Sequence, residues 1–123
     1  MPMTYHINPI CRMVTSQATG RLTDEELRQH QWQLRQDPTF DRTFRQLVDW
    51  TAITAMAVTP AGLRQLARYP LFQQGTPRAV AAPTDVLYGL ARMFQTLRNR
   101  QGDNIAVFRH LRLAQAWLDQ GEV

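Results

Sequence analysis

The sequence of 123 residues contains few of the side chains and motifs on which most enzyme chemistry depends. Its one cysteine, Cys11, excludes an intrachain disulfide, and this is typical of a cytoplasmic protein. Ser16 is the only serine and does not lie in the Gly-x-Ser-x-Gly motif of a hydrolase nucleophile. The six glycines are scattered and form no phosphate-binding loop. No apolar run is long enough for a membrane span, and the N-terminus lacks a signal-peptide pattern.

Lysine is absent as well, so all 14 basic residues are arginines. Residues 1–50 contain six arginines and six acidic residues, whereas residues 51–123 contain eight and four and so carry the whole net charge of +4. A basic half can attract an anion or an acidic partner. Its arginines are spread over several predicted elements and form no cationic run, so we expect no nucleic-acid binding.

Strand-like and helix-like segments alternate along the chain. A capping box at Thr23 and Glu26 and the Thr59-Pro60 pair mark two helix starts. A third start lies at Thr84 or Asp85. Strands are predicted over residues 3–8, 11–18, 44–53, 78–82 and 104–110, and helices over residues 24–37, 60–69, 85–99 and 111–120. The order β-β-α-β-α-β-α-β-α predicts a single α/β domain, residues 1–123, with a mixed, mostly parallel sheet of about five strands.

Three local expectations depend on turns and glycines. The Asn8-Pro9 turn predicts a hairpin that pairs Asn8 with Cys11 and His6 with Met13. Gly20 is expected to close the second strand. Gly89 lies inside a predicted helix and costs about 1 kcal/mol relative to alanine, so we expect a neighbouring sheet or helix to approach closely there. The alternative is that Gly89 leaves room for a ligand or partner.

Candidate catalytic groups do not cluster along the chain. The three histidines, His6, His30 and His110, have none of the spacings typical of a metal site. Cys11 lacks a predicted neighbouring base. Asp49 is expected at the end of a core strand, where it accepts hydrogen bonds from loop N–H groups. The sequence therefore predicts no enzyme, no metal and no cofactor.

Three stretches, DPTFDRTFRQLVDW (37–50), RAVAAPTDVLYGLARMFQTL (78–97) and IAVFRHLRLAQAWL (105–118), resemble the SpoIIAA-like proteins, small bacterial relatives of the STAS fold. The resemblance covers residues 4–118. It implies a STAS-like α/β domain without known catalytic activity. Most such proteins have no established function. Distant relatives bind lipids or nucleotides, or act as switch proteins that bind a kinase.

The chain departs from this pattern at one functional position. Phosphorylated anti-sigma-factor antagonists carry an Asp-Ser-Ser-Gly-type motif where a strand meets a helix. The corresponding region here is DWTAIT (49–54), which leads to Thr59 and contains no Ser-Ser-Gly. A phosphoserine switch therefore does not carry over, although Thr54, expected in a loop, and Thr59 have hydroxyls open to modification.

Two functions follow as hypotheses. The first is a non-catalytic regulatory or protein-interaction domain, with a protein partner or a homodimer contact on an exposed helix face. The second is a binder of a small amphipathic or anionic ligand, lipid-like or a nucleotide, in a cavity between helices and sheet. The candidate partner- or ligand-binding residues are Tyr88, Arg92, Met93, Trp50 and Thr59. Trp32, Trp50, Met56, Phe72 and Tyr88 are the large side chains that could line such a cavity, or simply belong to the core.

Overall fold

The computed structural model describes residues 3–120, which form one five-stranded sheet and four helices. The predicted order of elements is confirmed. In chain order the elements are β1 Met3–Asn8, β2 Met13–Thr23, α1 Asp24–Gln36, β3 Arg45–Ala57, α2 Pro60–Ala67, β4 Pro77–Ala81, α3 Asp85–Asn99, β5 Asn104–Phe108 and α4 Leu111–Gln120.

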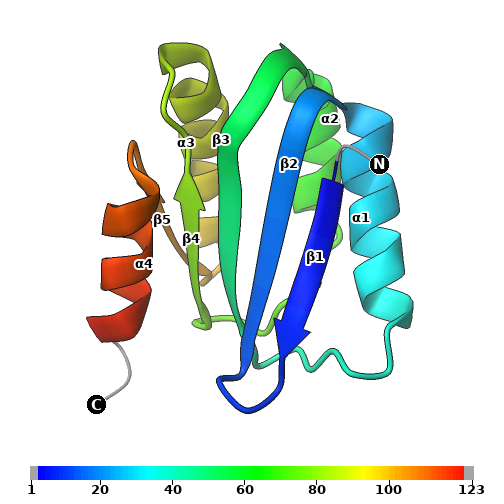
Figure 1. Cartoon of the computed structure of the whole chain (residues 1–123). Helices are drawn as coiled ribbons and strands as arrows, with labels where there is room; N and C mark the ends of the chain where they lie inside the picture. Colours follow the sequence, from blue (N-terminus) through cyan, green and yellow to red (C-terminus); the bar gives the residue numbers. More distant parts are fainter. Residues whose placement is uncertain (1–2, 121–123) are drawn as a thin grey trace.

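The strands lie side by side in chain order, β1-β2-β3-β4-β5. The β1–β2 pair is antiparallel and the other three pairs are parallel, so the sheet is mixed. Parallel neighbours need crossover connections of one hand, and an unreversed strand order therefore puts successive crossover helices on one face. Figure 1 shows α1, α2 and α3 on that face and α4 on the other, where it packs against β4, β3 and β5.

Side-chain caps begin the three helices that cover this face. Thr23 Oγ1 accepts from the Glu26 N–H at 3.3 Å and Glu26 Oε1 accepts from the Thr23 N–H at 3.0 Å, which completes the predicted capping box. Thr59 Oγ1 accepts from the Gly62 N–H, and Thr84 Oγ1 accepts from the Leu87 N–H. Each cap satisfies a backbone donor that the first helical turn cannot pair.

The core has one large and two smaller parts. The large cluster lies between the sheet and α1, α2 and α3, and it contains Leu22, Trp50, Leu63 and Leu87. A second cluster, around Leu118, lies between α4 and the opposite face of the sheet. A third contains Val14, Leu34, Phe44, Leu71 and Phe72. Burial of these apolar side chains is the main contribution that favours the folded chain.

Two expectations about β1 and β2 are wrong. Asn8 pairs with Met13 and His6 with Thr15, because the hairpin turn contains two more residues than predicted and Asn8 Oδ1 accepts from the N–H groups of Ile10 and Cys11. Gly20 does not close β2. It has φ +66°, a conformation that glycine adopts easily, and it lies beside a shift in the β2–β3 register, so β2 continues to Thr23 through a bulge.

The third strand also runs further than predicted. β3 extends to Ala57 because it stays paired with β2 as far as Thr23, so Thr54 lies in a strand and not in a loop. Conversely, α2 ends at Ala67 and β5 at Phe108, each two residues short of the prediction. Such differences at the ends of elements are common, since only tertiary pairing decides where a strand stops.

The expectation that Gly89 allows close packing is wrong. Gly89 is exposed, and a Cβ atom added there would have no heavy atom within 4 Å. Gly62, in α2, is the opposite case, because a Cβ there would overlap the carboxylate of Asp24. That carboxylate accepts from the Thr59 N–H at 2.8 Å and from the Thr59 hydroxyl at 2.7 Å, and so joins α1 to the start of α2.

These two glycines give a matched prediction. Gly89→Ala should raise the free energy of unfolding by about 1 kcal/mol, since alanine has the better helix propensity and meets no neighbour. Gly62→Ala should lower it, because the methyl group displaces the Asp24 carboxylate from Thr59. Urea denaturation of both variants measures the two changes, and a destabilised Gly89→Ala protein would contradict the open environment of that helix position.

Candidate functional site

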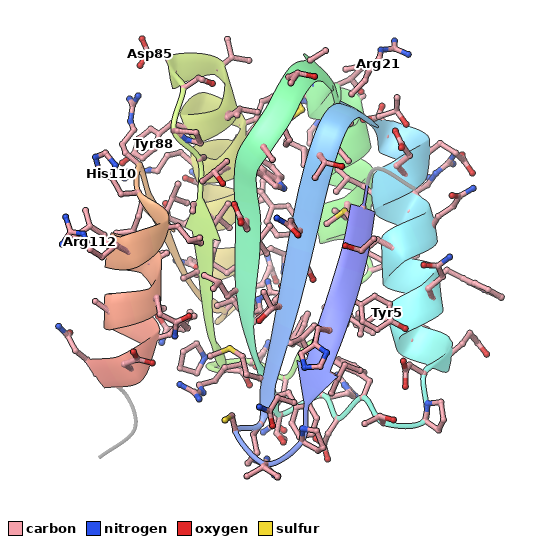
Figure 2. The ribbon with its side chains drawn as sticks, in the orientation of Figure 1. Tyr5, Arg21, Asp85, Tyr88, His110 and Arg112 are labelled. Atoms are coloured by element: carbon pink, nitrogen blue, oxygen red, sulfur yellow. The ribbon has the colours of Figure 1, made fainter. Side chains whose placement is uncertain are left out.

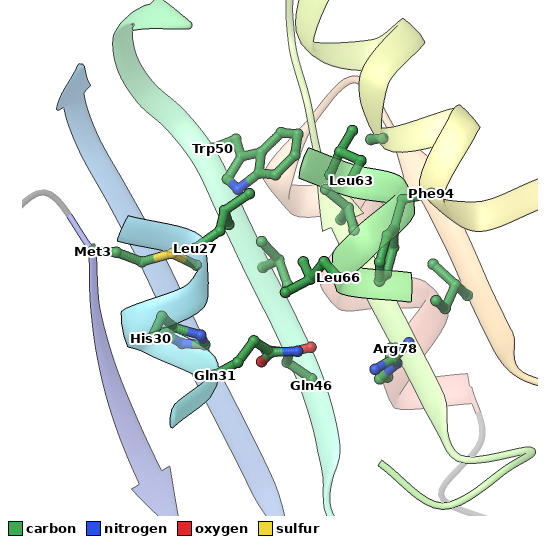
Figure 3. Close-up of a pocket in the computed structure, with 14 residues that line it drawn as sticks. Met3, Leu27, His30, Gln31, Gln46, Trp50, Leu63, Leu66, Arg78 and Phe94 are labelled. Atoms are coloured by element: carbon green, nitrogen blue, oxygen red, sulfur yellow. The ribbon is translucent and has the colours of Figure 1, made fainter. Parts of the chain in front are cut away.

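A cavity of about 70 Å³ lies between the sheet and the three helices on one face. Figure 3 shows its walls, with Leu27, His30 and Gln31 from α1, Leu63 and Leu66 from α2, and Phe94 from α3. Side chains of alternate strand residues form the floor. A single water molecule needs roughly 10–15 Å³ of such cavity space. The cavity therefore has room for about five waters or for one small organic molecule.

The floor changes from polar to apolar along β3. Gln46, Val48 and Trp50 are successive inward-facing residues of this strand. Gln46 pairs in register with Arg78 of β4, and Val48 pairs with Val80. The Gln46–Arg78 end therefore offers an amide and a guanidinium, whereas the rest of the floor is hydrocarbon as far as the indole of Trp50.

Trp50 carries a buried donor without a protein acceptor. Its side chain is 5% exposed, and no hydrogen-bond partner for its Nε1 is found among the described residues. Figure 3 shows the indole nitrogen on the side of the ring that is turned toward Leu27 and the cavity. An unpaired buried donor costs about 1–3 kcal/mol, so this end of the cavity favours any occupant that brings an acceptor.

A buried hydrogen-bonded chain links α1 to the sheet. Gln46 Nε2 donates to Ser16 Oγ at 3.0 Å, and Ser16 Oγ lies 2.9 Å from His30 Nε2. Because the Ser16 hydroxyl already accepts from Gln46, its own hydrogen is free to point at His30 Nε2, and the ring hydrogen then lies on Nδ1. This arrangement requires a neutral histidine, and it uses one of the two hydrogens of Gln46 Nε2.

Burial also keeps His30 neutral. Loss of solvent lowers the pKa of His30 from 6.5 to about 4, and a hydrogen bond with the Gln31 side chain opposes this only in part. Ser16 is fully buried and does not line the cavity. The pair thus has the spacing of a serine nucleophile and its base, but it does not present the hydroxyl to the cavity.

Charged groups are buried beside the polar end of the floor. Arg78 and Arg98 are 6% and 5% exposed, and both donate to the carboxylate of Asp103. Arg98 also donates to the carbonyl oxygen of Ala67 at 2.7 Å, which ties α3 to the end of α2. Desolvation lowers the pKa of Arg78 to about 10, and the Asp103 carboxylate opposes this change.

The outer side of the cavity continues into a groove between α1 and α2. Gln31 and Leu66 line both the cavity and an outer hollow that also includes Arg35. Trp32 and Tyr69 line this hollow and are 65% and 62% exposed. The gap between α1 and α2 is thus the direction from which a ligand would reach the cavity.

Comparison with known proteins supports the architecture. No protein-family model matches the chain, and no curated protein matches its sequence. Among solved structures, it is similar to an uncharacterised DUF3478-family protein from Shewanella loihica PV-4, described as having a SpoIIAA-like fold. The TM-score is 0.55 at 18% sequence identity, over 94% of this chain and 93% of that one. The chain has a SpoIIAA-like fold. The fold that the sequence resemblance implied is confirmed.

Within this SpoIIAA-like fold, the predicted site residues lie in separate places. Trp50 lines the cavity. Thr59 caps α2, and its hydroxyl donates to Asp24. Arg92 is exposed on α3, whereas Tyr88 and Met93 are half-buried and pack against the large core cluster. Of the three α3 candidates for an exposed helix face, only Arg92 is thus fully on the surface.

The large side chains proposed as cavity lining are also dispersed. Of the five, only Trp50 lines the cavity. Trp32 is exposed in the outer groove, Phe72 lies in the third core cluster, and Met56 and Tyr88 pack at the edge of the large cluster. Met56, Phe72 and Tyr88 thus follow the core alternative, because large apolar side chains are equally suited to core positions and the sequence alone does not show which of them line a cavity.

Sequence reasoning missed the polar groups that shape the site. His30 lies three residues after Leu27 and four before Leu34, so it occupies the buried stripe of α1. That spacing is visible in the sequence. By contrast, no local pattern could have brought Ser16 and Gln46 to His30, because β2–β3 pairing joins them.

Asp49 lies away from the cavity. It is 8% exposed, and the alternation of β3 turns it toward the face that carries α4. Its Oδ1 accepts from the N–H and the hydroxyl of Thr51, as expected for a backbone-capping carboxylate, although Thr51 belongs to the strand. Among residues 3–120, no group of three or more metal-ligating side chains is found, and no helix is long and apolar enough to cross a membrane.

The buried neutral His30 predicts a pH-dependent stability. Its folded pKa of about 4 lies below the unfolded value of 6.5, so the unfolded chain binds more protons between these values. The stabilising effect is complete above pH 6.5 and is lost as the pH falls toward 4. We expect the free energy of unfolding to drop by about 2 kcal/mol between pH 7.5 and 5.

Urea denaturation at both pH values measures this drop. His30→Gln should remove most of it, whereas His110→Gln, at an exposed position, should retain it. An equal drop in wild-type protein and His30→Gln would show that other groups cause the pH dependence.

Proposed function

We propose that this protein is a non-catalytic binding module whose cavity takes a small amphipathic ligand. The observation that carries the proposal is the buried Trp50 N–H, which faces a mostly apolar cavity and has no acceptor among residues 3–120. The ligand then has an apolar body for the side chains of Val48, Leu63 and Phe94, and a hydrogen-bond acceptor for Trp50. The cavity is far smaller than a nucleotide, and this favours a small lipid-like ligand.

The arrangement of polar side chains supports a role without catalysis. Ser16 is fully buried, and its hydroxyl is held between Gln46 and His30. Asp49, the buried carboxylate of β3, belongs to the opposite face of the sheet from His30. No acid, base and nucleophile therefore converge on the cavity among the described residues. Since the chain has one cysteine and so no intrachain disulfide, we propose that it acts in the cytoplasm.

Hexan-1-ol is a suitable neutral probe, because it has a short apolar chain and one hydroxyl. In ¹⁵N-labelled protein, the indole N–H resonance of Trp50, assigned by its loss in Trp50→Phe, should move downfield as the alcohol hydroxyl accepts its hydrogen. The indole resonances of Trp32 and Trp117 serve as internal references, since the first is exposed and the second belongs to α4 and packs against the core cluster on the opposite face of the sheet.

A cavity-filling variant tests the location. Ala91 of α3 is 2% exposed and lines the cavity, so Ala91→Leu should abolish the hexan-1-ol shift. The same variant should raise the free energy of unfolding by about 1 kcal/mol, as cavity filling commonly does. Ala116→Leu makes the same substitution at an exposed site of α4 and should leave binding unchanged. A Trp50 resonance that does not respond to hexan-1-ol contradicts the proposal.

Self-association is a second candidate function, favoured by the exposed face of α3. Val86 is 64% exposed, Gly89 leaves open space, and Arg92 is exposed beside the Tyr88 ring. Tyr88 also lies under Arg109, which forms an exposed ion pair with Asp85 at 2.7 Å. Figure 2 shows Asp85, Tyr88, His110 and Arg112 along one side of the molecule. We propose that the partner at this surface is a second copy of this chain, so that two chains form a homodimer. Such a contact could also serve a regulatory role.

The double variant Val86→Glu and Arg92→Glu tests this surface. If two copies associate through α3, size-exclusion chromatography should show the wild-type protein as a dimer and the double variant as a monomer. Arg35→Glu, on the exposed side of α1, is the control and should not change the elution volume. Wild-type protein and double variant that elute at the same volume would exclude α3 as the contact.

A further inference from the structure

The buried charges next to the cavity do not balance. Arg78, Arg98 and Asp103 have side-chain exposures of 7%, 6% and 4%, and they form one hydrogen-bonded cluster. Two guanidinium groups and one carboxylate give this cluster a net charge of +1. Asp103 and Arg98 are the two charged groups that act on the pKa of Arg78. An uncompensated charge in such a place is costly, and an anion beside it offsets the cost.

The geometry places this excess charge at the cavity. Arg98 takes the two-point contact with Asp103, through Nε at 2.8 Å and Nη2 at 3.1 Å. Arg78 donates to the same carboxylate through Nη2 alone, at 3.1 Å. The Arg78 side chain lines the cavity and its guanidinium lies over the Phe72 ring, 4.8 Å from the centroid. It is therefore the arginine of the cluster that a cavity ligand would meet.

Other groups at this end also suit an acceptor. Gln46 is the in-register neighbour of Arg78, and Gln31 lies at the opening toward the groove. Figure 3 shows Gln31, Gln46 and Arg78 together at one end of the lining residues and Trp50 at the other. No aspartate or glutamate lines the cavity among the described residues. The potential at this end is thus positive, with amide groups that can donate hydrogen bonds.

We infer that the ligand is a small carboxylic acid whose carboxylate lies at Arg78 and Gln46, whose apolar body extends along Val48, and whose far end carries the hydrogen-bond acceptor for Trp50. This inference rests on the proposed function of the cavity. A planar carboxylate matches the planar guanidinium and its parallel N–H groups. A body of only a few carbon atoms fits the volume of about 70 Å³, which a nucleotide or a whole phospholipid greatly exceeds.

A pair of nearly isosteric compounds separates charge from shape. Hexanoate and hexanamide have the same carbon chain, but only hexanoate is an anion at pH 7. We expect hexanoate to bind at least tenfold more tightly than hexanamide, measured by titration of ¹⁵N-labelled protein. The Nε–H resonance of Arg78 should shift with hexanoate, and the exposed Arg35 of the outer groove should not.

Two variants assign the effect to Arg78. Arg78→Gln should bring the two affinities within about twofold of each other, mainly through weaker binding of hexanoate. Arg35→Gln removes a positive charge near the opening and should keep the tenfold preference. If Arg78→Gln does not fold, the resonances that shift in wild-type protein decide whether the carboxylate lies at Arg78.

The outcomes distinguish this inference from the function on which it rests. Equal binding of hexanoate and hexanamide would overturn the carboxylate inference and leave the binding module intact. A preference for hexanoate with shifts confined to arginines of the surface would also overturn it, since the anion would then lie outside the cavity. If hexanoate, hexanamide and hexan-1-ol all fail to perturb residues of the cavity, the proposed function itself fails.

Discussion

The carboxylate of Asp103 is the point at which four elements of the structure meet. Asp103 directly precedes β5 and accepts from Arg98 of α3 and from Arg78 of β4, while Arg98 also donates to the last residue of α2. The Asp103 side chain, through Arg98 and Arg78, therefore fixes how α2 and α3 lie over β4. Removal of Asp103 would leave two buried guanidinium groups without a counter-charge, which is among the most destabilising changes that a small protein can undergo.

The cavity follows from this arrangement and from the inward side chains of β3. Three helices cover one face of the sheet, and the cluster at Asp103 holds two of them in place. Below them lie Gln46, Val48 and Trp50, whose character changes from polar to apolar along a single strand. Such a gradient is unusual for a region that serves only as core, because buried polar groups cost free energy unless they are paired.

The polar groups of this region fall into two classes. Ser16, His30 and Gln46 form one hydrogen-bonded chain, and they contribute to a unique packing of α1 on the sheet. The Trp50 N–H and the excess charge at Arg78 are not matched by the protein in the same way. Natural sequences commonly depart from full internal consistency where they bind something. A ligand with an anionic end at Arg78 and a hydrogen-bond acceptor at Trp50, joined by an apolar body, matches both departures.

The sequence by itself determined the order of the elements, the caps at Thr23 and Thr59, and the mixed α/β sheet, because these depend on local periodicity and on residues a few positions apart. It left the third cap open between Thr84 and Asp85, and the structure assigns it to Thr84. It also singled out Trp50. Tertiary structure alone decided the length of β2 and β3 and the exposure of Gly89. It likewise brought Ser16 to His30 and Arg78 to Asp103, since pairing between distant strands sets which side chains share an interior. The residues of the site therefore come together only in the folded structure.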